Sequence, residues 1–102
     1  MITIDTLHKA NFDPYLNETF TVHSEVVGSQ EVVLVELTEK NQPGLECFSL
    51  IFKGPQAPLM RQMTYTITHH QMGELQLFMV PVQYGKQDGI YYQSVFNRLL
   101  EK

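Results

Sequence analysis

The chain has 102 residues, which is enough for one domain and too few for two. Hydrophobic residues make up 43% of it and charged residues 18%, a composition typical of a globular domain rather than a disordered segment. The net charge of −4 argues against nucleic-acid binding, because neutralising phosphates requires a basic face. No apolar run approaches the roughly 18 residues that a transmembrane helix requires.

The cysteine content and the N-terminal sequence predict folding in the cytoplasm. Cys47 is the only cysteine, so no intramolecular disulfide supports the fold. Residues 1–20 lack the basic cluster followed by an apolar stretch that a secretory signal requires. We therefore expect a cytoplasmic protein. Export as part of a larger assembly stays open, because it needs no such signal.

The N-terminal region contains a predicted helical turn and a predicted strand. Asp5 or Thr6 is suited to cap a turn over residues 7–10, which has to end before Pro14, because the residue that precedes a proline avoids the α region. Residues 18–23 then alternate between apolar and polar side chains, with the period of a half-buried strand. The residues expected to face inward are Phe20 and Val22.

Residues 31–39 and 46–53 alternate in the same way, and the turn pair Pro43–Gly44 lies between them. The two segments predict a hairpin that turns at residues 41–44. In the first segment, one face carries Val33, Val35 and Leu37 and the other carries Val32 and Leu34. In the second segment, one face carries Phe48, Leu50 and Phe52 and the other carries Cys47, Ser49 and Ile51.

A second hairpin is predicted from residues 63–69 and 74–82, with Gly73 supplying a positive φ near the turn. Pro81 has no N–H group to donate, so the second strand ends there, bulges, or lies at an edge at that point. The first strand alternates threonines with larger side chains, which are Met63, Tyr65 and Ile67.

Residues 90–100 fit two structures. Apolar side chains recur from Tyr92 at the spacing i, i+3, i+4, i+7 and i+8, which is that of a helical stripe. The pair Tyr91–Tyr92 directly after the Asp88–Gly89 turn instead fits the returning arm of a hairpin. We favour a strand over residues 90–97, followed by a frayed or helical tail.

Glycine and proline clusters separate these segments at intervals of roughly ten residues, a spacing typical of all-β proteins. No linker, internal repeat or low-complexity segment interrupts residues 1–102. The sequence therefore predicts a single all-β domain. Its architecture is a small antiparallel barrel or sandwich of five to seven strands, with one short N-terminal helical turn.

Four motifs follow one another along the chain: Phe48–Pro55 (FSLIFKGP), Tyr65 to His69 (YxxxH), Gly73–Val82 (GELQLFMVPV) and Phe96–Asn97. Their order resembles the pattern FSLIFxGP, YxxxH, GxxxLFxVPV and FN of a family of small, uncharacterised bacterial domains, over residues 12–98. The pattern contains no catalytic signature. Members of that family are often encoded beside phage-tail-like proteins, so the resemblance implies a component of such an assembly.

The histidines and the cysteine do not predict a catalytic centre. His69 and His70 are adjacent, so on a strand they point to opposite faces and cannot bind one ion together. The other two histidines have no ligand partner at a suitable spacing. Cys47 has no neighbouring cation or glycine-rich turn that would stabilise a thiolate. We expect no catalytic residue, metal or cofactor, and we expect His69 to bond to backbone or to a carboxylate such as Glu74.

Two regions are candidates for protein contact. The loop at residues 54–58 is stiffened by two prolines and displays the apolar side chains that follow it, unless these tuck into the core. Residues 64–68 and 90–95 carry no charge and so lack the usual protection of an edge strand, unless both strands are central and already paired. The candidate residues are Leu59, Met60 and Met63 beside the loop, and Thr66 and Gln93 on the strands.

The sequence therefore supports two functional hypotheses. The favoured one is a non-catalytic structural or interaction module that binds a protein partner or itself, as a homo-oligomer or as a subunit of a bacterial assembly. An enzyme requires polar groups that converge in a concave site, whereas a module requires an exposed apolar patch or a free strand edge. The alternative is a small enzyme or ligand-binding barrel with a pocket lined by methionines and by Tyr65, His69, Tyr91 and Tyr92.

Overall fold

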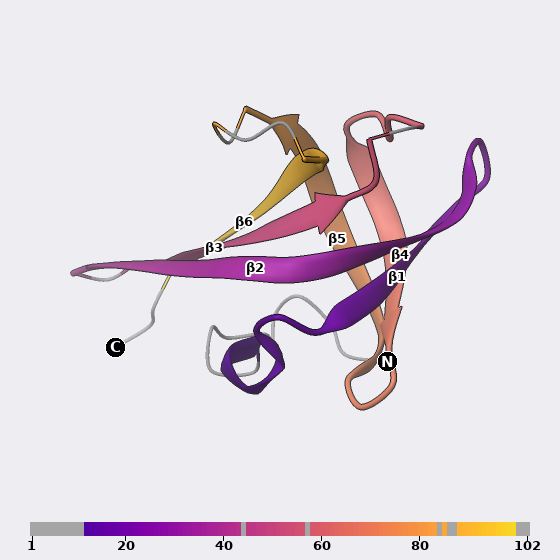
Figure 1. The fold of residues 1–102 in the computed structure, drawn as a ribbon. Helices are drawn as coiled ribbons and strands as arrows, with labels where there is room; N and C mark the ends of the chain where they lie inside the picture. Colours follow the sequence, from indigo (N-terminus) through magenta and orange to yellow (C-terminus); the bar gives the residue numbers. More distant parts are fainter. Residues whose placement is uncertain (1–11, 44, 57, 84, 86–87, 100–102) are drawn as a thin grey trace.

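The computed structural model describes residues 12–43, 45–56, 58–83, 85 and 88–99, with the backbone alone for residues 40–42 and 97–99. Six antiparallel strands form a closed barrel in the order β1–β2–β3–β6–β5–β4 (Figure 1), which confirms the predicted all-β fold. None of the helical segments in these ranges has the length and hydropathy of a membrane span. The strands are β1 (Thr19–Ser24), β2 (Gly28–Gln42), β3 (Leu45–Gly54), β4 (Met63–His69), β5 (Gly73–Val82) and β6 (Ile90–Leu99).

A 3-10 turn, η2 (Asp13–Tyr15), precedes β1. Pro14 is tolerated in it because the first residues of a helix have no intrahelical acceptor for their N–H groups. The turn predicted over residues 7–10 lies outside the described residues. The helical turn that the structure does describe therefore contains the proline that was expected to follow it.

The strand hypothesis for the C-terminal segment is confirmed. β6 pairs with β3 along its whole length and continues to Leu99, past the point where we expected a frayed or helical tail. Ladder hydrogen bonds and cross-strand side-chain contacts with β3 outweigh the local helical spacing. In β5, Pro81 lies beyond the last residue pair with β4, at Met79, so the strand is at an edge there, one of the three alternatives expected.

β2 contains one extra residue, Val35, relative to its partner β3, and the pairing register shifts between Leu34 and Glu36. Before the shift Leu34 is fully buried, and after it Leu37 packs against the core. The prediction that Leu37 shares a face with Val33 and Val35 is therefore wrong. A β-bulge inserts one residue into the alternation, and every later side chain then changes face.

Aromatic side chains join the N-terminal segment to the barrel. Phe12 is fully buried, with its ring centroid 6.2 Å from that of Phe48 and 6.0 Å from that of Phe96. The rings of Phe48 and Phe96 stack, with centroids 4.5 Å apart and planes 7° from parallel. Phe12 thus packs against both β3 and β6, and its burial fixes where the chain enters β1.

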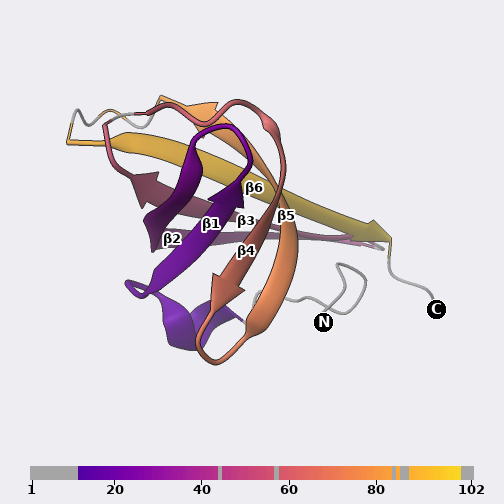
Figure 2. The same cartoon turned by 90° about the vertical axis from the view of Figure 1, so that its right-hand side faces the viewer.

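Two short pairings close the barrel. Residues 80–82 of β5 pair with residues 91–93 of β6, and residues 21–23 of β1 pair with residues 66–68 of β4. Beyond Gln93, β6 pairs with β3 alone in the part of the chain that the structure describes. As a result, the distal parts of β2, β3 and β6 extend past the rest of the barrel as a three-stranded sheet (Figure 2).

Replacing Phe12 by alanine is expected to lower the free energy of unfolding by about 3 kcal/mol or more, because it opens a cavity beside the stacked rings of Phe48 and Phe96. Urea titration followed by circular dichroism measures the change. Leu16→Ala is the control, since Leu16 is 41% exposed and its truncation opens no buried cavity. Equal stabilities of the two variants would contradict the role of Phe12.

Candidate functional site

The loop between β3 and β4 places its methionine inside the barrel. Met60 is 1% exposed, and its N–H group donates to the Tyr92 hydroxyl at 3.1 Å. Leu59 and Met63 are exposed, at 58% and 43%. Of the two alternatives for Met60, the core position is the observed one, because the barrel interior offers its N–H group an acceptor. Met60 is therefore not part of a contact surface.

Thr66 and Gln93 lie on strands that are paired on both sides. Thr66 has partners in β1 and β5, and Gln93 has partners in β3 and β5. Neither residue lies at a free edge, because closure of the barrel gives each strand a second neighbouring strand. The local sequence contains no sign of that second neighbour. Both side chains remain on the outer surface, where Gln93 lines the groove described below.

The tyrosines proposed to line a pocket do not all lie together. Tyr65 and Tyr92 are core residues, and burial raises the pKa of both hydroxyls. The Tyr65 hydroxyl donates to the Arg61 carbonyl at 2.6 Å. Tyr91 donates its hydroxyl proton to Asp88 Oδ1 at 2.8 Å. Because neighbouring residues of a strand face opposite sides, Tyr91 and Tyr92 do not share a pocket wall.

Three polar side chains, Glu18, His69 and His70, meet beside the β4–β5 turn and are called the histidine latch below. Nε2 of His69 lies 2.8 Å and Nε2 of His70 3.3 Å from the same oxygen, Oε1 of Glu18. The His69 side chain is fully buried, with its ring 4.5 Å from those of Tyr15 and Phe20. The expectation that the two histidines point to opposite faces is wrong, because β4 ends at His69 and the alternation of the strand ends with it.

The latch has the spacing of a metal site, since its three ligand atoms lie within 4.8 Å of one another. The hydrogen bonds of His69 oppose that role. Its Nδ1 accepts the backbone N–H groups of Gln71 and Met72, at 3.1 and 3.2 Å, so the network assigns the ring proton to Nε2, which donates to Glu18. A metal-binding histidine has the opposite arrangement, in which the second nitrogen donates. His69 thus bonds to backbone and carboxylate, as expected, but the carboxylate is Glu18 rather than Glu74.

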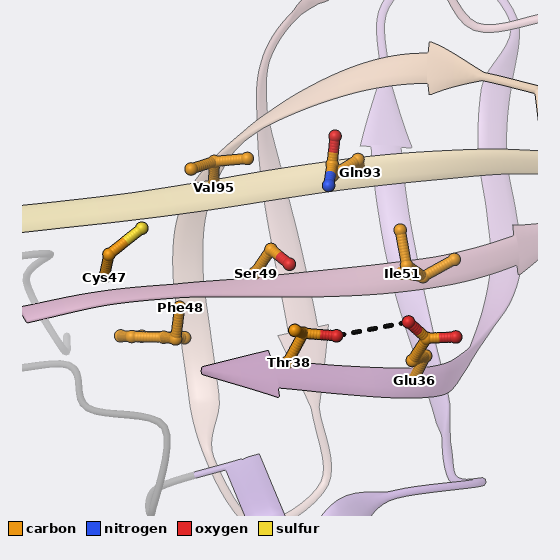
Figure 3. A pocket seen from close by; sticks show the side chains of 8 residues that line it. All are labelled: Glu36, Thr38, Cys47, Phe48, Ser49, Ile51, Gln93 and Val95. Carbon is orange, nitrogen blue, oxygen red and sulfur yellow. Dashed lines mark hydrogen bonds between the residues drawn. The ribbon is translucent and has the colours of Figure 1, made fainter. Parts of the chain in front are cut away.

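A groove of about 320 Å³ lies on the outer face of the sheet formed by β2, β3 and β6 (Figure 3). Its centre is apolar, with Ile51 on β3 and Val95 on β6. Ile51 is 6% exposed although it points away from the core, whereas Val95 is 49% exposed. The cross-strand register sets the lining in two rows, Glu36–Ile51–Gln93 and Thr38–Ser49–Val95.

The bulge in β2 explains the position of this groove. It changes the face on which the later residues of β2 lie, so Glu36 and Thr38 point outward beside β3. Glu36 pairs with Ile51 directly after the shift, so the two side chains lie side by side on the outer face. The signal in the sequence was a large apolar residue, Ile51, on the face that we assigned to Cys47 and Ser49.

The groove can bind but has little means of catalysis. None of the described side chains that line it is a histidine, lysine or arginine. Cys47 is half-buried at one end, and the Glu36 carboxylate lies at the other end, where it accepts a hydrogen bond from the Thr38 hydroxyl at 3.1 Å (Figure 3). These groups do not form a nucleophile–base pair, so the absence of a catalytic residue stays a prediction with a geometric basis.

Residues 7–96 match the family model described as Domain of unknown function (DUF6916). The chain belongs to this family. The match agrees with the resemblance to small uncharacterised domains, while the motif order and the phage-tail association remain predictions. Comparisons with curated proteins and with solved structures find no match.

Metal removal is expected to leave the melting temperature of the DUF6916 domain unchanged to within about 1 °C, because His69 uses both ring nitrogens in the fold. Differential scanning calorimetry before and after exhaustive EDTA treatment, and then with added Zn²⁺, measures this. A drop of several degrees that Zn²⁺ reverses would show that the latch is a metal site.

Stability is also expected to depend on the charge of Glu18. The hydrogen bond from His69 holds the pKa of this carboxyl below its usual value of 4.5. A lowered folded-state pKa stabilises the fold above pH 4.5, and this stabilisation is lost as the pH falls through the folded-state pKa. Wild type should exceed Glu18→Gln in unfolding free energy at pH 7, and the difference should shrink toward pH 3.

Urea titrations at the two pH values measure this difference. Glu74→Gln, which removes an exposed carboxylate from the β4–β5 hairpin that carries His69, is the matched control. A difference between wild type and Glu18→Gln that is the same at pH 7 and pH 3 would contradict the role of the ionised carboxylate.

Proposed function

We propose that the domain is a non-catalytic interaction module that binds another protein through the outer face of β2, β3 and β6. The apolar groove carries this proposal, since Val95 is half exposed in it beside Ile51. Removing apolar surface from water is favourable by roughly 25 cal/mol per Å², so a partner that covers Val95 and Ile51 gains free energy. The motif resemblance suggests the setting, a bacterial multi-subunit assembly of the phage-tail type.

The uneven character of the outer surface supports this assignment. Phe78 on β5 is 46% exposed, and Val80 on the same face is half-buried opposite Gln93. Exposed apolar side chains thus occur on the outer faces of both β5 and β6. The outward residues of β1 and β4 are mostly threonines, which suit a face that stays in water: Thr19, Thr21, Thr64, Thr66 and Thr68.

The size of the domain gives a second reason. A chain of 102 residues has a limited core, and its single cysteine cannot form an intramolecular disulfide. Burial of further apolar surface against a partner therefore adds stability that the isolated domain lacks. This reason applies equally to a different protein and to a second copy of the chain.

Replacing Val95 by lysine is expected to reduce partner binding by about tenfold or more, because it puts an unpaired charge into the centre of the interface. Thr66→Lys is the matched control: it makes a similar change on the outer face of β4 and should leave binding within about twofold. Tagged full-length chains expressed in the native host are compared by the ratio of co-purified protein to bait, and circular dichroism checks that both variants fold.

The outcome that would contradict the module is a wild-type chain that purifies as a strict monomer, without a protein partner, and retains a small molecule. Equal co-purification with Val95→Lys and Thr66→Lys would place the binding surface elsewhere.

A further inference from the structure

We propose that the domain has a second binding site, beside the first part of β2, which takes an extended segment of a different protein as an added strand. The site is a pocket of about 550 Å³, called the β2-edge pocket below. It shares none of its described lining residues with the outer groove, so this inference goes beyond the proposed function. The residues that line it are Val27, Ser29, Gln30, Glu31, Pro55 and Pro58.

Gln30 brings an unsatisfied hydrogen-bond acceptor to the β2-edge pocket. Its side chain reaches from β2 to Pro58, where Nε2 donates to the backbone carbonyl at 3.2 Å. This bond sets the orientation of the amide, because a flipped amide would place two oxygens against each other. Oε1 is then buried, and it has no hydrogen-bond partner in the part of the chain that the structure describes. Since Gln30 is only 7% exposed, such an acceptor is costly unless a bound group donates an N–H or O–H to it.

The backbone of β2 faces the same pocket. Residues 28–32 pair with β1 alone among the described strands. Just beyond them, the N–H group of Leu34 donates to the carbonyl of Glu18, next to β1, at 3.1 Å. Because the backbone groups of a strand point alternately to its two sides, those of Ser29 and Glu31 point away from β1 and toward the pocket. They have the spacing of donors and acceptors that an added strand requires.

Two prolines explain why β3 does not cover this part of β2. The pairing of β2 with β3 begins at Val33 and Lys53, and the same register would put Pro55 opposite Glu31. Proline has no N–H group to donate, so the ladder between the two strands cannot continue there. Pro55 and Pro58 are both exposed, and their rings give the pocket an apolar wall. A bound segment therefore has backbone partners on one side and apolar contacts on the other.

An extended segment of a different protein fits this pocket better than a second copy of the chain. In a two-fold pairing of β2 with β2, each copy would bring its own Pro55 and Pro58 into the space that the other strand has to enter. A segment without such a flanking loop avoids this clash. We expect one of its side chains to donate to Oε1 of Gln30, which serine, threonine, asparagine and glutamine can do.

The test places a benzophenone-bearing residue at Glu31, which is exposed and lines the pocket, in the tagged full-length chain in its native host. Illumination attaches a segment that lies there, mass spectrometry maps it, and the mapped segment is made as a synthetic peptide. Amide hydrogen exchange, followed by NMR, then compares the free wild-type chain with its complex with this peptide. The amides of Ser29 and Glu31 are expected to exchange about tenfold more slowly or less in the complex, because they become ladder donors.

Replacing Gln30 by methionine tests the acceptor. Gln30→Met is expected to weaken binding of the peptide about tenfold, because the donor of the peptide loses its partner. It should leave the melting temperature of the free chain within about 2 °C, because it removes an unsatisfied acceptor together with the bond to Pro58. Gln76→Met is the matched control: it makes the same change at an exposed position of β5 outside the pocket and should leave binding within about twofold.

A peptide from a different protein that slows both amides and binds Gln30→Met less tightly supports the added strand. An adduct with a second copy overturns it, as does a peptide that leaves the exchange of Ser29 and Glu31 unchanged or binds wild type and Gln30→Met equally. The absence of a protein adduct at Glu31 overturns it too. None of these results depends on Val95, so the outer groove is judged separately by Val95→Lys.

Discussion

One extra residue in β2 determines how the barrel is built. Residues 28–33 of β2 pair with β1 and residues 33–42 pair with β3, and the register shift between Leu34 and Glu36 follows directly after the residue that pairs with both, Val33. The bulge lets one strand of 15 residues bend from one side of the barrel to the other, and it turns Leu37 toward the core. It also turns Glu36 and Thr38 outward beside β3. The groove is therefore a by-product of the way in which the barrel closes, and no separate structural element is needed to form it.

In the closed barrel, the side chains that could otherwise act as catalytic groups form hydrogen bonds within the fold. His69 contacts the η2 segment, the start of β1 and the β4–β5 turn through hydrogen bonds or ring contacts. One ring nitrogen of His69 bonds to Glu18, and the other accepts backbone N–H groups. The Tyr92 hydroxyl accepts a hydrogen bond from the N–H group of Met60. A buried polar group is costly unless it is hydrogen-bonded, so these bonds are a condition of the fold. The described contacts of these groups are within the fold, and the function that we propose uses exposed side chains instead.

The sequence predicted the strands well because period-two alternation reports directly on a half-buried strand. Residues 63–69 and the inward faces of β1 and β3 are as expected. It failed where the answer depends on distant partners or on a break in the alternation. The change of face at Leu37 follows from a single inserted residue, and the proximity of His69 and His70 follows from the end of β4 between them. Whether Thr66 and Gln93 lie at an edge is a property of the closed sheet, which no local pattern contains.

The two sides of the outer surface differ in how their side chains interact with water. On the β1–β4 side, polar side chains bond to one another across strands: Gln76 Nε2 donates to Thr66 Oγ1 at 2.7 Å, and the His23 ring and the Thr68 hydroxyl bond at 3.0 Å. Water can replace or complete each of these bonds, so this face gains little when a partner covers it. On the β2–β3–β6 side, the half-exposed Val95 has no such compensation, and covering it lowers the free energy. The binding face that we propose is the one on which the bulge has also turned Glu36 and Thr38 outward beside β3.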